Sequence, residues 1–168
     1  MRDVRLLGTG QLLELQRRLR TAGNESLRSS MQRRVRRAAE PLHSDLQSAI
    51  RQLPLSATGR RGRGGRSPTT RPLRATIAQA IRISVRTSAG SAGARVWIDR
   101  SRLPRDITTG LVRQINDGRV RHPVFGNRRR WAQQTAPPLW WERTVRSHTP
   151  RMEREVARVL DDVRRRLT

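Results

Sequence analysis

Apolar residues in the first third of the chain follow a helical period. A short stripe lies within residues 10–20 and ends before Gly23, a residue type that favours helix ends. A longer stripe, in steps of three and four residues, runs over residues 27–53. Pro41 falls inside this stripe, yet the apolar register continues past it. We therefore expect an N-terminal helical arm over residues 1–23, followed by one long, kinked helix.

The middle of the chain alternates apolar and polar residues, as half-buried strands do. A short helix that begins at Pro72 leads into a strand over residues 81–86, and a loop over residues 88–93 leads to a second strand over residues 94–98. This pair predicts a β-hairpin with a longer loop. Because two strands alone are marginally stable, we expect a third strand or the long helix to cover the apolar face.

The last third of the chain predicts a helix, a strand and a second helix. Apolar residues spaced by four predict a helix near residues 105–116, and residues 120–125 predict an additional strand of the same sheet. Thr149 and Pro150 are typical of a helix start, and apolar positions continue to Leu167. The expected fold class is α+β, with a small antiparallel sheet, formed by the hairpin and one or two further strands, packed by a long N-terminal helix and a C-terminal helix.

The composition predicts a single domain with extended arms. A chain of 168 residues suits one domain over residues 1–168, but only 34% of its residues are hydrophobic and 30% are charged. There is no cysteine, which excludes disulfides and thiolate metal sites. The sequence also lacks an apolar run that could cross a membrane or serve as a secretory signal. We therefore expect a soluble protein with a small core and no membrane partner.

All 37 residues counted as lysine or arginine are arginines, since the sequence contains no lysine. With 13 acidic residues, they give a formal net charge of +24. The guanidinium fork suits carboxylates and phosphates, so this charge favours acidic protein partners or nucleic acid. A GC-rich coding sequence would also produce arginine without lysine. The charge therefore indicates anionic partners without choosing between them.

Residues 54–71 are predicted to form a flexible loop rich in arginine and glycine. No acidic residue occurs between Asp45 and Asp99, so no neighbour in the sequence neutralises this charge. A solvated loop, an arm that contacts nucleic acid and a contact to an acidic neighbouring subunit are all consistent with this composition. Four arginines lie between Gly59 and Arg66, and these are the predicted basic residues of the loop: Arg60, Arg61, Arg63 and Arg66.

The aromatic residues are concentrated in one window. The chain has four tryptophans and one phenylalanine, and only Trp97 lies outside residues 122–141. Large rings bury much area and are enriched at interfaces, so the window predicts a subunit contact or, alternatively, a hydrophobic loop over the core. The residues predicted to form a subunit interface are His122, Pro123, Phe125, Gly126, Trp131, Trp140 and Trp141.

The sequence lacks the spacings of known catalytic and metal sites. His43, His122 and His148 are far apart, the carboxylates are scattered, and there is no glycine-rich phosphate-binding motif. For His122, which precedes a proline in an aromatic setting, a packed or hydrogen-bonded histidine is the simpler interpretation. We therefore expect no enzymatic activity, no cofactor and no metal.

One segment resembles a known family. The residues His122–Asn127 (HPVFGN), followed by Trp131 and Gln134 and preceded by Asn116–Gly118 (NDG), resemble the tail-completion, or neck, proteins of long-tailed bacteriophages. The expected order of elements agrees along residues 25–167, with the HPVFGN segment carrying most of the specificity. The resemblance identifies the chain as similar to a head-tail joining protein.

The resemblance implies a structural virion protein at the head-tail junction, assembled in the host cytoplasm. Such a protein forms a ring, of six copies in this family, between the head connector or adaptor and the tail terminator or tail tube. Genomic DNA would pass through this ring. The motif does not separate a neck subunit from a tail terminator, and the arginine-glycine insertion at residues 60–66 departs from the family pattern.

A basic nucleic-acid-binding protein is the alternative function. A cationic field of this size binds phosphate in a salt-dependent way. Against this alternative, the arginines are spread over the chain, no known docking motif occurs, and the aromatic residues do not alternate with basic ones as in a stacking platform. A scaffold of acidic partners outside phages, such as a ribosome-associated protein, is a third possibility.

Overall fold

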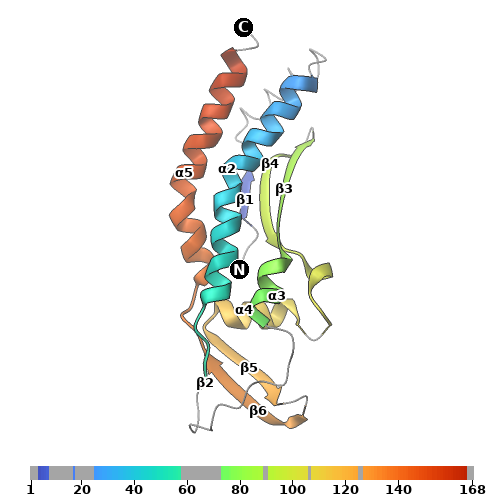
Figure 1. The fold of residues 1–168 in the computed structure, drawn as a ribbon, viewed down its shortest axis with the longest axis vertical. Coiled ribbons are helices and arrows are strands. Elements are labelled where there is room, and N and C mark those ends of the chain that lie inside the picture. Colours follow the sequence, from blue (N-terminus) through green and yellow to red (C-terminus); the bar gives the residue numbers. More distant parts are fainter. Residues whose placement is uncertain are drawn as a thin grey trace.

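A computed structural model of the chain describes residues 4–7, 17, 25–57, 73–88, 91–105, 107–124 and 127–165. These residues form an elongated α+β molecule, which confirms the predicted fold class (Figure 1). The elements are β1 (Val4–Leu7), α2 (Glu25–Gln52), β2 (Ser56–Ala57), α3 (Leu73–Ala80), β3 (Ile81–Ser88), β4 (Ser91–Ile98), the short helix η1 (Arg100–Arg102), α4 (Thr109–Asn116), β5 (Arg119–Val124), β6 (Asn127–Thr135) and α5 (Trp140–Arg165).

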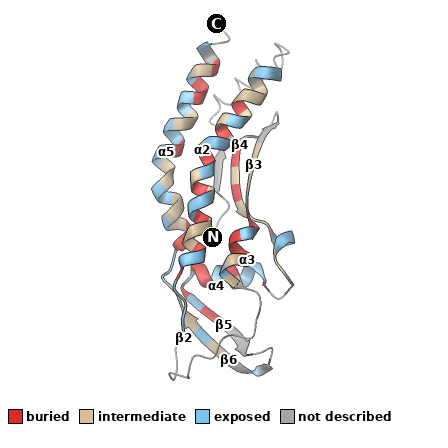
Figure 2. Ribbon diagram, in the orientation of Figure 1, coloured by how far each residue is buried: buried red, intermediate tan, exposed pale blue. Residues whose placement is uncertain are grey.

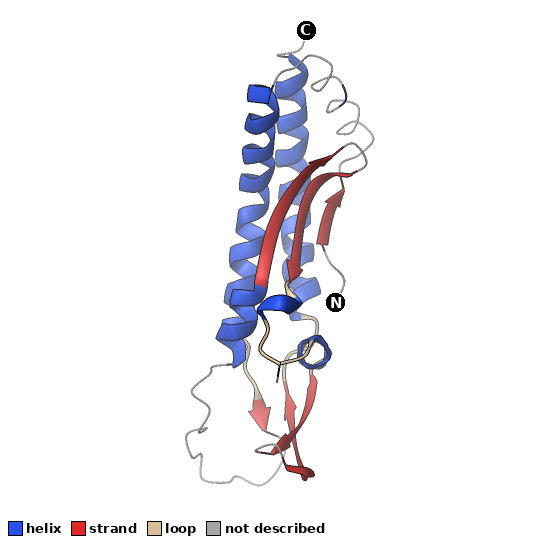
Figure 3. Ribbon diagram, turned by 90° about the vertical axis from the view of Figure 1, so that its right-hand side faces the viewer, coloured by secondary structure: helices blue, strands red, loops and turns tan. Residues whose placement is uncertain are grey.

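Two long helices, α2 and α5, form the spine of the molecule. They lie side by side and run in opposite directions (Figures 1 and 3). Their inner faces share an apolar cluster in which Met31 and Val35 of α2 lie with Val159 and Val163 of α5. The predicted single helix through Pro41 is confirmed. Its apolar stripe is long enough to hold the helix together across the proline, which removes only one helical hydrogen bond.

The first sheet lies along α2 and has the strand order β1-β4-β3, with antiparallel pairs. Ile81 and Val96 point from this sheet into a core that also contains Leu42, Leu46 and Ile50 of α2. Full burial of such a side chain contributes about 1.5–3 kcal/mol. The expectation that the long helix covers the apolar face of the hairpin is therefore confirmed.

Two predictions about the first sheet were wrong. The ladder extends to the pair Ser88–Ser91, so the hairpin loop has two residues instead of the six of the predicted loop over 88–93. In addition, Val4–Leu7 pairs with β4 and forms a strand, where a helical arm over 1–23 was expected. An edge strand is held by main-chain hydrogen bonds, so its apolar pattern can be short. Within the same arm residue 17 is helical, as expected, and the rest of the arm lies outside the described residues.

The second sheet lies at the far end of the spine, with the order β2-β6-β5 (Figure 1). The strand expected at residues 120–125 exists as β5, but it pairs with β6 and does not join the first sheet. β6 is mostly polar, so its sequence gave no strand signal. Ser56 and Ala57 pair with the end of β6, which makes this part of the expected loop over 54–71 a strand. Residues 58–71 lie outside the described residues.

Two helix starts also differ from the predictions. α4 begins at Thr109 instead of 105, because the Thr108 hydroxyl caps it by accepting the Leu111 N–H at 3.2 Å. α5 begins at Trp140, so Pro150, predicted to start the helix, lies inside it. The Thr149 hydroxyl donates to the Val145 carbonyl at 3.0 Å, a bond made within a helix.

Burial is uneven along the molecule (Figure 2). Buried residues line the inner sides of the two long helices and one face of the first sheet, whereas the second sheet has few. Val120 is the buried hydrophobic residue of β5, at 2% exposure. The second sheet is therefore attached to the core by one face and presents the other to solvent.

Candidate interface on the second sheet

Strand geometry sorts the second sheet into two faces, because successive side chains point to opposite sides. Val120 is buried, and Ala132 and Gln134 on the same face are half-buried. The residues of the opposite face are all exposed. We call this set the outer face, and it consists of Ser56, Arg119, Arg121, Trp131, Gln133 and Thr135.

Trp131 is the largest apolar side chain of the outer face, and it lies at the end of this face next to the register shift. Its side chain is 46% exposed, which is unusual for so large an apolar group. The guanidinium carbon of Arg121 lies 4.8 Å from the centre of the Trp131 ring. Such a cation–π contact contributes about 0.5–1 kcal/mol at an exposed site. The contact favours a guanidinium position over the ring, and N–H groups that do not face the ring can donate to a carboxylate or phosphate.

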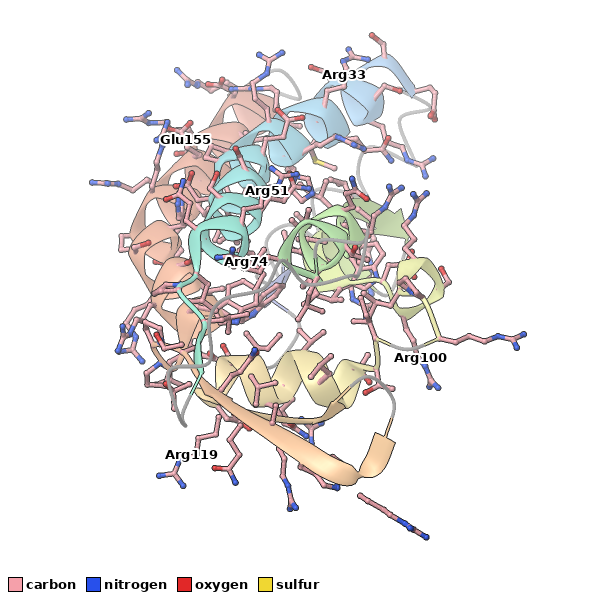
Figure 4. All side chains as sticks on the ribbon, turned by 60° about the horizontal axis from the view of Figure 1, so that its bottom comes forward. Arg33, Arg51, Arg74, Arg100, Arg119 and Glu155 are labelled. Carbon is pink, nitrogen blue, oxygen red and sulfur yellow. The ribbon has the colours of Figure 1, made fainter. Side chains whose placement is uncertain are left out.

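The three strands of the second sheet contain no acidic residue. Their arginines are Arg119, Arg121, Arg128, Arg129 and Arg130. The last three lie in the segment of β6 between Asn127, which pairs with Val124, and Trp131, which pairs with Pro123. The pairing register shifts there, because adjacent residues of β5 pair with residues of β6 that are four apart. Arginine side chains extend away from the body at this end, as Figure 4 shows for Arg119. The sheet therefore presents a cationic surface with one aromatic ring.

A buried amide joins the second sheet to the spine. Asn116, at the end of α4, is 1% exposed. Its side-chain nitrogen donates to Glu142 Oε2 at 2.9 Å, and its Oδ1 accepts the Trp141 N–H at 3.1 Å. Its backbone carbonyl accepts the Leu139 N–H at 2.6 Å. Asn116 therefore caps the first turn of α5 from a different helix, in the manner of an N-cap side chain.

Glu142 is held as a carboxylate beside this amide. Burial on its own raises the pKa of Glu142, while hydrogen bonds from the Asn116 side chain and from its own backbone N–H lower it. The net pKa lies below the ordinary value. A carboxylate in the first turn also suits the positive end of the helix dipole. The charge at this position therefore supports the start of α5.

Gly118 closes the same junction. It has a φ of 83°, and its carbonyl accepts the Ala136 N–H at 3.1 Å. A Cβ at this position would lie 2.9 Å from the Ala136 oxygen and 3.2 Å from the Pro138 Cβ. Only glycine combines that backbone conformation with so close a contact. The turn before β5 is therefore bound tightly to the segment after β6.

The structure separates the predicted interface residues. Trp131 lies on the outer face. Trp140 and Trp141 are 4% and 2% exposed and meet edge to face, with ring centres 5.6 Å apart. These two are core residues of the chain itself, contrary to the prediction, because α5 begins there. His122 and Pro123 lie on β5, but their side chains are not among those that the structure describes. The following predicted residues lie outside the described part of the chain: Arg60, Arg61, Arg63, Arg66, Phe125 and Gly126.

Sequence reasoning missed Arg119, Arg121 and Gln133 as members of this surface. The signal lay in the hairpin around HPVFGN, whose register places residue 121 opposite residue 133. The aromatic residues were not expected to alternate with basic ones as in a stacking platform, but two tryptophans do have an arginine over the ring. Arg121 lies over Trp131, and Arg95 lies 4.9 Å from the ring centre of Trp97 on β4.

The described histidines have structural partners. His43 Nε2 lies 2.9 Å from the Ile81 carbonyl, and His148 Nε2 lies 2.7 Å from Asp45 Oδ2. Across the described residues, no three metal-ligating side chains gather in one place.

The described helices are also too short or too polar to cross a membrane. No family model, curated protein or solved structure matches the chain. The candidate interface therefore rests on its own geometry and charge.

Proposed function

We propose that this protein is a structural virion subunit of a long-tailed bacteriophage, in the ring that joins the head connector to the tail. The observation that carries the proposal is the outer face: a solvent-exposed, acid-free sheet surface in which Arg121 lies over Trp131. Tryptophan and arginine dominate the energetics of protein interfaces. The HPVFGN resemblance supplies the location, because this segment contains part of the β5–β6 hairpin.

In this role the outer face contacts an acidic surface of a neighbouring virion protein. Trp131 supplies apolar area, and the arginines pair with carboxylates. Charge complementarity of this kind sets the orientation and rate of association more than its affinity. The elongated shape supports the role, because the second sheet and the free ends of α2 and α5 lie at opposite ends (Figure 1). Each subunit can therefore contact one partner at each end.

Ring formation requires that each copy bind the next through two different surfaces, so that the rotation closes. β5 is an edge strand of the described sheet, and edges pair readily with other strands. A hexameric ring around the DNA path is the assembly that we propose, by the family resemblance. The mass of the assembled species in solution or in the virion tests this arrangement.

The decisive experiment is head-tail joining in vitro with the double variant Arg121→Ala/Trp131→Ala. We expect the variant to fold but to reduce joining at least tenfold, since it removes both members of the cation–π pair on the outer face. The matched control is Arg146→Ala/Arg143→Ala, which removes exposed arginines from α5. Normal joining by the outer-face variant, or equal loss in the control, would contradict the proposal. A second variant in the same experiment is the deletion of Arg60–Arg66, which we expect to leave the fold intact and to block joining.

A nucleic-acid-binding protein is the second candidate, and the stacked Arg121–Trp131 pair favours it. Base stacking on an exposed ring next to arginines is the usual means of binding single strands. Binding of a short DNA strand by the isolated monomer, with a steep dependence on salt and loss in the double variant, would support this candidate instead.

A further inference from the structure

A groove between the two long helices has a distinct chemistry, remote from the second sheet. It encloses about 310 Å³, at the small end of the range for binding pockets. Arg34, Arg37, Ala38 and Pro41 line it from α2. Arg151, Glu155 and Val159 line it from α5.

The groove has an apolar floor and a charged rim. Val159 is buried and Ala38 and Pro41 are half-buried, whereas Arg37 and Arg151 are exposed. The floor is suited to a short aliphatic group. A charged group bound above it would meet the guanidinium groups at the rim.

The charges of the rim are only partly compensated. Arg34 pairs with Asp162 at 2.6 Å, and Glu155 pairs with Arg158 at 2.9 Å. Within the described part of the chain, Arg37 and Arg151 have no acidic side chain within 4.0 Å. Two guanidinium groups, one from each helix, therefore face the groove without an acidic partner.

Pro41 adds a backbone acceptor to the groove. In a helix the carbonyl of residue 37 accepts the N–H of residue 41, and proline has none. The Arg37 carbonyl therefore lacks its helical donor beside the lining proline. An incoming N–H group can supply that bond.

We propose that this groove binds an acidic peptide segment of a partner protein. One carboxylate of the segment lies between Arg37 and Arg151, and its methylene carbons cover Ala38, Pro41 and Val159. A peptide N–H of the segment donates to the Arg37 carbonyl. This inference goes beyond the proposed function, because it does not depend on a ring, a virion or the outer face.

The groove favours a peptide over nucleic acid for two reasons. Glu155 and the Arg37 carbonyl are acceptors that can receive peptide N–H groups, and a phosphodiester has no such donor. The apolar floor also offers nothing to a sugar-phosphate backbone, whereas an aspartate or glutamate side chain brings its own methylene carbons.

The test is fluorescence anisotropy of the full chain with a labelled peptide of alternating glutamate and alanine. The salt concentration is about 0.15 M, where long-range attraction is screened beyond about 8 Å. Three other measurements accompany it: the same peptide with glutamine for glutamate, a short DNA duplex, and the variant Arg37→Ala/Arg151→Ala. The matched control variant is Arg33→Ala/Arg154→Ala, which removes two exposed arginines of the same helices that do not line the groove.

We expect the groove variant to bind the glutamate peptide at least tenfold more weakly than the control variant does. The glutamine peptide should bind weakly to all forms, and DNA should lose affinity equally in both variants. Equal loss of the glutamate peptide in both variants, no binding by the unmodified chain, or a selective loss of DNA in the groove variant would overturn the proposal.

A second variant covers the case in which the arginine variant does not fold. Ala38→Glu places a competing carboxylate in the groove and is expected to reduce peptide binding at least tenfold without removing an arginine. Full binding by a folded Ala38→Glu protein would equally overturn the proposal.

Discussion

The two sheets of this molecule each have three antiparallel strands but are used differently. The first sheet lies along α2, and Ile81, Ala94 and Val96 are at most 3% exposed. The second sheet buries Val120 and leaves its other face open, with Trp131 nearly half exposed. Each sheet carries a tryptophan with an arginine over its ring. The difference teaches that helix cover and the apolar alternation of the strands together decide which sheet builds the core and which one presents a surface.

The largest expected difference is between a tryptophan of the core, Trp141, and the exposed tryptophan of the second sheet, Trp131. Trp141→Ala should lower the free energy of unfolding by about 3–5 kcal/mol, because it opens a large cavity in the core. Trp131→Ala should change it by less than about 1 kcal/mol, since the lost contact is exposed. Chemical denaturation of both variants measures the difference. Similar losses would show that the second sheet is packed as tightly as the core.

Two glycines test how rigidly the second sheet is attached. Gly118→Ala should destabilise the protein by about 1–3 kcal/mol, since alanine is strained at positive φ and its Cβ meets the Ala136 carbonyl. Gly110→Ala, in α4, should stabilise it by about 0.5–1 kcal/mol, because its nearest contact is an ordinary 3.4 Å. Thermal unfolding should therefore shift in opposite directions. A gain in stability for Gly118→Ala would contradict the positive φ and the close contact to Ala136 described for this turn.

The smallest expected effect concerns acid. The Arg34 hydrogen bond holds the pKa of Asp162 below 3.8 and joins α2 to α5. A lowered folded-state pKa gives stability that is present above the unfolded pKa and lost as pH falls through the folded one. The melting temperature should therefore fall between about pH 5 and pH 2, and fall less in Asp162→Asn. Glu153→Gln, an exposed change on the same helix, should keep the full pH dependence.

Local patterns predicted α2, most of α5, and the strands β3 and β4, but not β1. The stripe of α2 and the alternation in β3 and β4 come from burial against each other, so each leaves a clear period in the sequence. The starts of α4 and α5 were missed because caps depend on distant partners. Asn116 caps α5 from another helix, and no pattern near Trp140 shows this.

The candidate interface was only partly predictable. Trp131 was predicted as an interface residue and lies on the outer face. Trp140 and Trp141 were grouped with it because they are near it in the sequence, but in the structure they are buried in the core. β6 is polar, so its strand is specified by pairing with β5 and by the turn between them. Arg121 becomes part of the surface through that register. Cross-strand neighbours of this kind are set by tertiary structure, which a single sequence records weakly.

The Asn116 side chain has a consequence for any closed assembly. The Asn116 amide fixes the angle between the second sheet and the spine formed by α2 and α5. In a cyclic oligomer the same angular error is repeated at every step, so a small rotation at this hinge would prevent the circle from closing. A single buried residue that takes no part in any contact surface can therefore decide whether copies make a ring or an open spiral.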